Sequence, residues 1–98
     1  MKFLNLIGPQ IRRLRDNRSW THAKLTLKLQ VSGLSISRSG LSKIEARLVA
    51  VSDIKLLHLS EVLGVTVPEL YPLRQKNESL KDHLKRHLGE SPENVHKR

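Results

Sequence analysis

The sequence predicts an all-α fold, a bundle of five helices followed by an extra C-terminal helix. Apolar residues recur three or four positions apart rather than in alternation, which is the spacing of one helix face. Hydroxyl and carboxamide residues stand where these stretches begin, and Gly64 stands where one of them ends, as helix caps do. The chain has 98 residues, of which 38% are hydrophobic, so it can build one modest core.

Five helices are expected within residues 1–73. Their ranges are 3–17, 21–29, 38–46, about 53–63 and a short stretch that begins at Pro68. Each range carries apolar residues that we expect to face the core: Ile7, Ile11, Leu14, Ala23, Leu25, Leu29, Leu41, Ile44, Leu56, Leu59, Leu63 and Leu70. The expected N-terminal caps are Asn5, Thr21, Ser37 and either Ser52 or Asp53. Trp20 directly precedes a cap, where an apolar residue is expected to pack against the first turn rather than to contact a ligand.

A sixth helix is expected after the composition shifts at Pro72, with Asn77 as a candidate cap. Three leucines spaced four apart form its narrow apolar stripe: Leu80, Leu84 and Leu88. The stripe either docks on the chain's own bundle or pairs with a second subunit, because its width suits both. From Gly89 onward nothing apolar recurs, and a frayed tail is expected. The chain therefore divides into residues 1–73 and an amphipathic helix with a flexible tail over 74–98.

The formal net charge of +9 is placed unevenly. Residues 1–50 hold ten Lys or Arg against two acidic residues, whereas residues 51–98 hold eight against seven. A basic half beside a nearly neutral one favours a face that binds phosphates. The alternative is a basic protein whose charges only keep it in solution.

Several kinds of function find no support in the residue types present. There is no cysteine, so a disulfide framework, a zinc finger and thiol catalysis are excluded. There is no glycine-rich phosphate loop, carboxylate pair or catalytic triad, so we expect neither an enzyme nor a cofactor. His83 and His87 lie one helical turn apart without a third ligand at suitable spacing, so no metal site is expected. No apolar stretch suits a signal peptide or a membrane span, which favours a cytoplasmic protein without membrane contact.

The stretch from Ile36 to Glu45 carries the strongest functional signal. Ser37 is a good cap, and Leu41 and Ile44 fall on one face of the helix that follows it. The opposite face carries basic or small hydroxyl side chains: Arg38, Ser39, Ser42 and Lys43. Because such a face has donors and little bulk, its first turn can enter a DNA major groove.

A family resemblance extends over about residues 5–73. Four segments carry it by their order and spacing: Ile7 to Arg15, Trp20 to Leu25, Ser37 to Glu45, and Ser52 to Leu70. Together they resemble the helix-turn-helix domain of the lambda-type phage repressor, Cro and XRE family. The resemblance implies a sequence-specific DNA-binding transcriptional regulator, a repressor, that acts as a homodimer on double-stranded DNA.

The resemblance also implies roles for individual residues. The base-reading positions are Arg38, Ser39, Ser42 and Lys43. The phosphate-contacting positions are Thr21, His22, Ser37 and Arg47. Arg15 and Glu45 fall where related repressors place a partly buried ion pair, which we interpret as structural.

The chain departs from the family between Leu29 and Ser37, where the usual turn is much tighter. Seven residues, 30–36, separate the two positions. Their apolar and polar residues alternate around Gly33, which predicts an ordered, enlarged loop. This loop bears on the angle between the two flanking helices and therefore on how the second helix would dock.

Two other functions remain open at this level. The chain could be the antitoxin of a toxin–antitoxin pair, which would use the same domain for autoregulation and bind a small protein partner through residues 74–98. It could also be an interaction module whose basic face binds RNA or an acidic protein. That reading predicts little preference among duplex DNA sequences.

Overall fold

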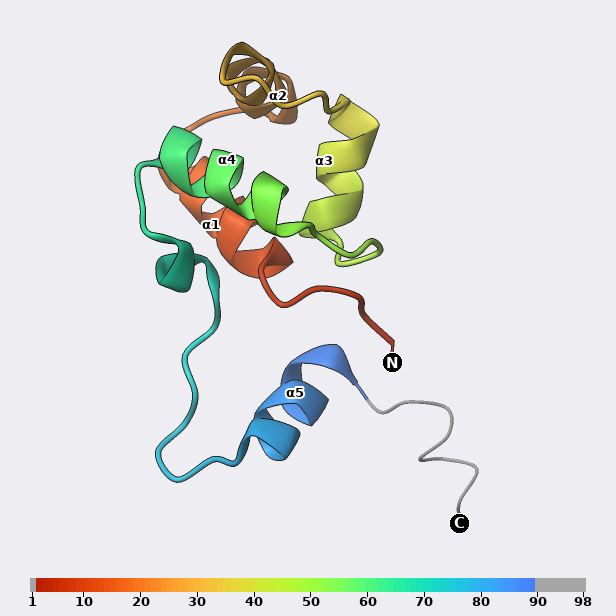
Figure 1. The fold of residues 1–98 in the computed structure, drawn as a ribbon, viewed down its shortest axis with the longest axis vertical. Helices are drawn as coiled ribbons and strands as arrows, with labels where there is room; N and C mark the ends of the chain where they lie inside the picture. The colour runs from red at the N-terminus through yellow and green to blue at the C-terminus, as the bar shows by residue number, and fades with distance from the viewer. Residues whose placement is uncertain (1, 90–98) are drawn as a thin grey trace.

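Five α-helices and one 3-10 turn make up residues 2–89, which are the residues that this computed structural model describes (Figure 1). The elements are α1 (Gly8–Asn17), α2 (His22–Val31), α3 (Arg38–Glu45), α4 (Asp53–Leu63), the 3-10 turn η1 (Val67–Leu70) and α5 (Leu80–Leu88). These residues contain no strand, so the all-α prediction is confirmed. The frayed tail that was expected beyond Gly89 falls outside the described residues.

Local side-chain caps fix the beginnings of α2, α3 and α4. The hydroxyl oxygens of Thr21, Ser37 and Ser52 accept hydrogen bonds from backbone amides three residues ahead, at 3.0, 2.9 and 3.2 Å. Each bond satisfies one of the free amides of a first helical turn. At the other end of α4, Gly64 adopts a left-handed conformation with φ of 71°, which glycine tolerates without strain. The predicted caps Thr21, Ser37 and Ser52 and the predicted stop at Gly64 are confirmed.

The first helix begins five residues later than predicted, at Gly8. Asn5 does satisfy helix-terminal amides, because its Oδ1 accepts from the backbone N–H groups of Ile7 and Gly8 at 3.1 and 2.9 Å. Its Nδ2 donates to the carbonyls of Ile44 and Val49, both at 3.0 Å. Asn5 is therefore held by distant backbone, and α1 begins only at Gly8, after Ile7.

The short helix expected from Pro68 is instead the four-residue 3-10 turn η1. A carboxylate oxygen of Glu69 accepts from the Thr66 amide and hydroxyl at 3.1 and 2.8 Å, which closes a tight box. Pro72 follows shortly afterwards and cannot supply the next amide, so the turn does not grow into an α-helix.

The core lies between α1, α2, α3 and α4. Helix α3 packs against both α1 and α2, while α4 packs against α1, α2 and η1. The core consists of aliphatic side chains: Ile7, Ile11, Leu25, Leu29, Leu34, Leu41, Leu59, Leu63 and Leu70. The expected core faces are borne out except at Ala23, which is exposed because it points away from the buried side of α2.

Helix α5 lies apart from the other helices, beside the N-terminal segment (Figure 1). The amides of Lys2 and Phe3 both donate to the Leu88 carbonyl at 3.0 Å, so this helix end docks on the chain's own N-terminus. The predicted leucine stripe is only partly buried, because Leu80 is 53% exposed while His83 takes an inward position. The cap is Ser79 rather than Asn77, since the Ser79 hydroxyl accepts from the Asp82 amide.

Candidate nucleic-acid interface

Helix α3 has one buried face and one open face. Leu41 and Ile44 are fully buried where α3 meets α1 and α2. The four residues predicted to read bases are all exposed: Arg38, Ser39, Ser42 and Lys43. At helical spacing they share one side of α3, which therefore offers hydrogen-bond donors, positive charge and almost no bulk to a partner.

Gly40 lies within α3 at a position where a side chain would be crowded. A Cβ at this position would lie 3.3 Å from the Ser37 hydroxyl oxygen and 3.4 Å from Cγ1 of Ile36. The Gly40 amide is also the donor to that hydroxyl oxygen. The glycine therefore makes room for the cap and for the turn that precedes it, at some cost in helix propensity.

A buried ionic network ties α3 to α1. Glu45, at the end of α3, receives two hydrogen bonds from the Arg15 guanidinium, Nε to Oε2 at 2.8 Å and Nη2 to Oε1 at 3.1 Å. The Arg15 side chain is 10% exposed and the Glu45 side chain is 5% exposed. Arg15 also donates from Nη1 to the Trp20 carbonyl at 2.7 Å. The pair expected between these residues is thus present and bidentate, a geometry that fixes both partners.

His22 joins this network from the start of α2. Its Nε2 lies 3.0 Å from Oε1 of Glu45. Burial raises the pKa of Glu45, but hydrogen bonds from Arg15 and His22, with their charges, outweigh it and hold the pKa below its ordinary value. One carboxylate therefore orients α1, α2 and α3 together.

Of the four expected phosphate-contacting residues, two have exposed side chains at helix beginnings and two make contacts within the chain. Thr21 and Ser37 are exposed at helix beginnings, where their hydroxyls accept from the helix and can still donate to an anion. His22 is bonded to Glu45, although 36% of its side chain remains exposed. Arg47 has a different set of partners, described next.

Arg47 lies in the loop after α3, with a positive φ of 64°. Its guanidinium stacks on the Phe3 ring, 3.7 Å from the centroid, and Nη1 donates to the His87 carbonyl at 2.8 Å. Both contacts hold the end of α5 and the N-terminal segment against this loop. One nitrogen of the guanidinium is thus bonded within the chain, and the phosphate contact of Arg47 stays a prediction.

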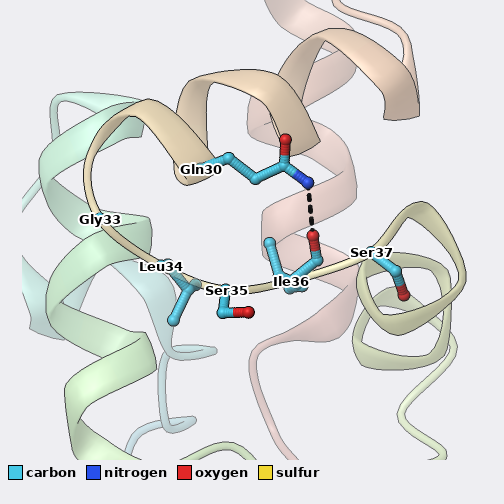
Figure 2. A pocket seen from close by; sticks show the side chains of 6 residues that line it. All are labelled: Gln30, Gly33, Leu34, Ser35, Ile36 and Ser37. Carbon is cyan, nitrogen blue, oxygen red and sulfur yellow. Dashed lines mark hydrogen bonds between the residues drawn. The ribbon is translucent and has the colours of Figure 1, made fainter.

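The enlarged connection between α2 and α3 is ordered, and it is shorter than predicted because Gln30 and Val31 belong to α2. Residues 32–37 form it, and Figure 2 shows the open hollow along them. Gly33 has a φ of 108°, a conformation that other residues rarely adopt. The Leu34 side chain enters the core, while the Gln30 amide spans the hollow to the Ile36 carbonyl at 2.7 Å.

Three contacts near α3 could not be assigned from the sequence. The Gln30 bond and the two carbonyl bonds of Asn5 join segments whose approach depends on the fold. His22 was predicted to contact a phosphate, but its bond to Glu45 was not foreseen. Trp20 packs against the core as expected, and the Lys28 ammonium lies 4.7 Å from its ring centroid.

Within residues 2–89, no group of His, Asp and Glu side chains is arranged to hold a metal ion. His83 and His87 contact each other edge to face, with centroids 4.9 Å apart. Burial, followed by the charge of Arg86, lowers the pKa of His87. No helix among the same residues is long and apolar enough to cross a membrane.

Comparisons with protein-family models, curated proteins and solved structures find no match to this chain. What the chain does has therefore to be inferred from its own residues and from their arrangement around α3. Two features of that arrangement matter most: the open donor face of α3 and the network that fixes the helix to its neighbours.

Proposed function

We propose that this chain is a sequence-specific DNA-binding transcriptional regulator, a repressor that occupies an operator with α3 in the major groove. The observation that carries the proposal is the open face of α3, where donors stand on a helix anchored from behind by Leu41 and Ile44. A major groove admits one α-helix, and its base edges offer acceptors to such donors.

The residue types on this face suit base reading. Arg38, in the first turn, has a planar guanidinium that can donate twice to O6 and N7 of one guanine. Ser39 and Ser42 can each donate or accept, and Lys43 adds a second cation one turn further along. Thr21 and Ser37 cap the starts of two helices, and their exposed hydroxyls can also donate to phosphates, which supports a phosphate-contacting role.

The order of helices supports a lambda-repressor-like helix-turn-helix arrangement for residues 1–73. In it α2 and α3 are the two helices of the motif, joined by residues 32–37, with α1 and α4 packed against them. The buried network of Glu45 holds α3 in a fixed orientation before DNA arrives. A preorganised helix loses less conformational entropy on binding, which favours affinity and specificity.

A repressor of this size is expected to act as a homodimer in the cytoplasm. Two subunits on a two-fold axis would read half-sites about 34 Å apart, one turn of DNA. The few basic contacts of one subunit would give weak binding that comes mostly from phosphates. Pairing two subunits doubles the base contacts and imposes a palindromic operator.

Selection of bound sequences from random duplex DNA, at two salt concentrations, tests the proposal. We expect a palindromic or nearly palindromic motif that survives the higher salt, because base contacts depend less on salt than phosphate contacts do. Recovery of no motif, with binding that collapses as salt rises, would refute base reading. It would favour a basic module that binds RNA or an acidic protein, whereas co-purification of a small partner would favour an antitoxin.

A further inference from the structure

The geometry points to Gln30 as a positioning residue for α3. Its side-chain amide holds the second half of the turn between α2 and α3 and so sets the direction in which α3 presents its first turn to DNA. This inference rests on the proposed function and adds to it a residue that determines specificity without touching a base.

The bond spans the enlarged turn at its open side. Gln30 lies in the last turn of α2, and its Nε2 donates to the Ile36 carbonyl at 2.7 Å (Figure 2). Ile36 directly precedes Ser37, the cap of α3. The bond therefore joins the end of α2 to the beginning of α3 across the surface, by a path that does not pass through the core.

The first half of the turn is held by other contacts. The Gly33 amide donates to the Gln30 carbonyl and the Leu34 amide to the Leu29 carbonyl, both at 3.0 Å. Leu34 is buried in the core, and Ser32 Oγ lies 2.9 Å from His58 Nδ1. These contacts fix the chain as far as Leu34.

The second half depends on two contacts. The Ile36 side chain is half-buried against the core and lies under Gly40, and its carbonyl accepts from Gln30. Hydrophobic packing of this kind has little directional preference, whereas a hydrogen bond of 2.7 Å depends strongly on the direction in which the donor approaches. Gln30 therefore supplies the directional constraint on the residue that leads into the α3 cap.

The position of Gln30 gives it leverage over base contacts. Helix α3 has eight residues, so it is about 12 Å long, and it is anchored by the buried Leu41 and Ile44 and by the Glu45 bonds, all of which lie after its first turn. A rotation of about 10° about the buried Leu41, about 4.5 Å along the helix from Arg38, would move the Arg38 backbone by about 0.8 Å, which exceeds the tolerance of about 0.5 Å for a preorganised contact. Arg38 lies at that moving end.

The test compares Gln30→Met and Gln30→Ala with wild type on a duplex carrying the motif that wild type selects and on a random duplex of equal length. Gln30→Met keeps most of the volume but removes the donor. We expect both variants to bind the motif about tenfold more weakly, the loss of roughly one base contact. Binding to the random duplex should change less than about twofold, and the preference at the base opposite Arg38 should relax. Val31→Ala, at a neighbouring residue that is 80% exposed, is the control and should change neither.

Three results would overturn the inference. Unchanged binding and unchanged base preference in Gln30→Met would show that the bond positions nothing. An equal loss on both duplexes would make Gln30 a phosphate contact. A large drop in the unfolding midpoint would make its role structural, because an exposed hydrogen bond should contribute only about 1 kcal/mol.

A DNA-free measurement separates this inference from the proposed function. The Gly40 amide donates to the Ser37 hydroxyl at the first turn of α3, so its hydrogen exchange reports how firmly that turn is held. Exchange several-fold faster in Gln30→Met supports the positioning role even if wild type selects no DNA motif, an outcome that would refute the proposed function alone. An unchanged exchange rate would contradict the positioning role whatever the chain binds.

Discussion

Replacing Glu45 by glutamine should destabilise the fold more than any other single change of a carboxylate. The variant keeps the size of the side chain but leaves the Arg15 guanidinium buried without its ionic partner. Removing one partner of a buried pair costs about 3–5 kcal/mol. We expect the lower end, about 3 kcal/mol, because Arg15 retains the Trp20 carbonyl at 2.7 Å and Asp16 Oδ1 at 3.4 Å. For a domain of this size that corresponds to a fall in Tm of roughly 12–24 °C.

The pH dependence gives the same prediction an independent check. The pKa of Glu45 is depressed in the folded chain, so its stabilisation is fully present above the ordinary value of 4.5 and is lost as pH falls through the depressed value. The difference in unfolding free energy between wild type and Glu45→Gln should therefore shrink in acid. Denaturant unfolding at pH 7 and at several lower values measures it.

The matched control is Glu61→Gln, which changes an exposed carboxylate on α4. It should alter the unfolding free energy by less than about 0.5 kcal/mol. If Glu45→Gln unfolds at the same denaturant concentration as this control at pH 7, the network does not hold α3 to α1, and the reasoning about its orientation fails.

Two further predictions concern the close packing at Gly8 and the ion pair between Glu78 and Arg86. Gly8→Ala should destabilise the fold by about 2 kcal/mol in thermal unfolding, because a Cβ would lie 2.5 Å from the Ile44 carbonyl oxygen and 2.6 Å from that of Glu45; an unchanged Tm would contradict this close contact. The carboxyl of Glu78 should titrate by NMR with a pKa of about 2, chiefly because Arg86 donates to it. Arg86→Ala should move that pKa upward toward 4.5, and a midpoint that stays near 2 would contradict this cause.

The parts of the fold that local chemistry determines could be predicted from the sequence. Thr21, Ser37 and Ser52 each need only an amide three residues away to act as caps, and Gly64 needs only a free left-handed conformation. These interactions lie within one or two helical turns. The boundaries of α3 and α4 followed closely from them.

The errors occurred where distant segments decide the outcome. The first helix was predicted over residues 3–17 with Asn5 as its cap, but α1 begins only at Gly8, and the carbonyls of Ile44 and Val49 bind the Asn5 side-chain amide. The C-terminal stripe was expected from its leucines, yet His83 is buried and Leu80 is exposed in α5, whose end docks on the N-terminal segment through Leu88. The spacing of residues along the chain does not show that Asn5 meets the Ile44 and Val49 carbonyls, or that the end of α5 meets the N-terminal segment.

The same distinction applies to the candidate site. The open face of α3 follows from helical spacing alone, so its exposed residues could be named in advance. The partners of Arg47 could not, because they come from Phe3 at one end of the chain and His87 near the other. His22 is an intermediate case, since its place at the start of α2 was clear and its bond to Glu45 was not.

In the proposed function, Arg38 reads a base from the first turn of α3. The most direct measurement is the ratio of affinities for the selected duplex and a random duplex, for wild type, Arg38→Ala and the charge-matched control Lys76→Ala, at one salt concentration. We expect Arg38→Ala to lower the ratio by about tenfold or more, the loss of one base contact, and Lys76→Ala to leave it unchanged. Equal losses on both duplexes for Arg38→Ala would show a phosphate contact only and contradict the claim.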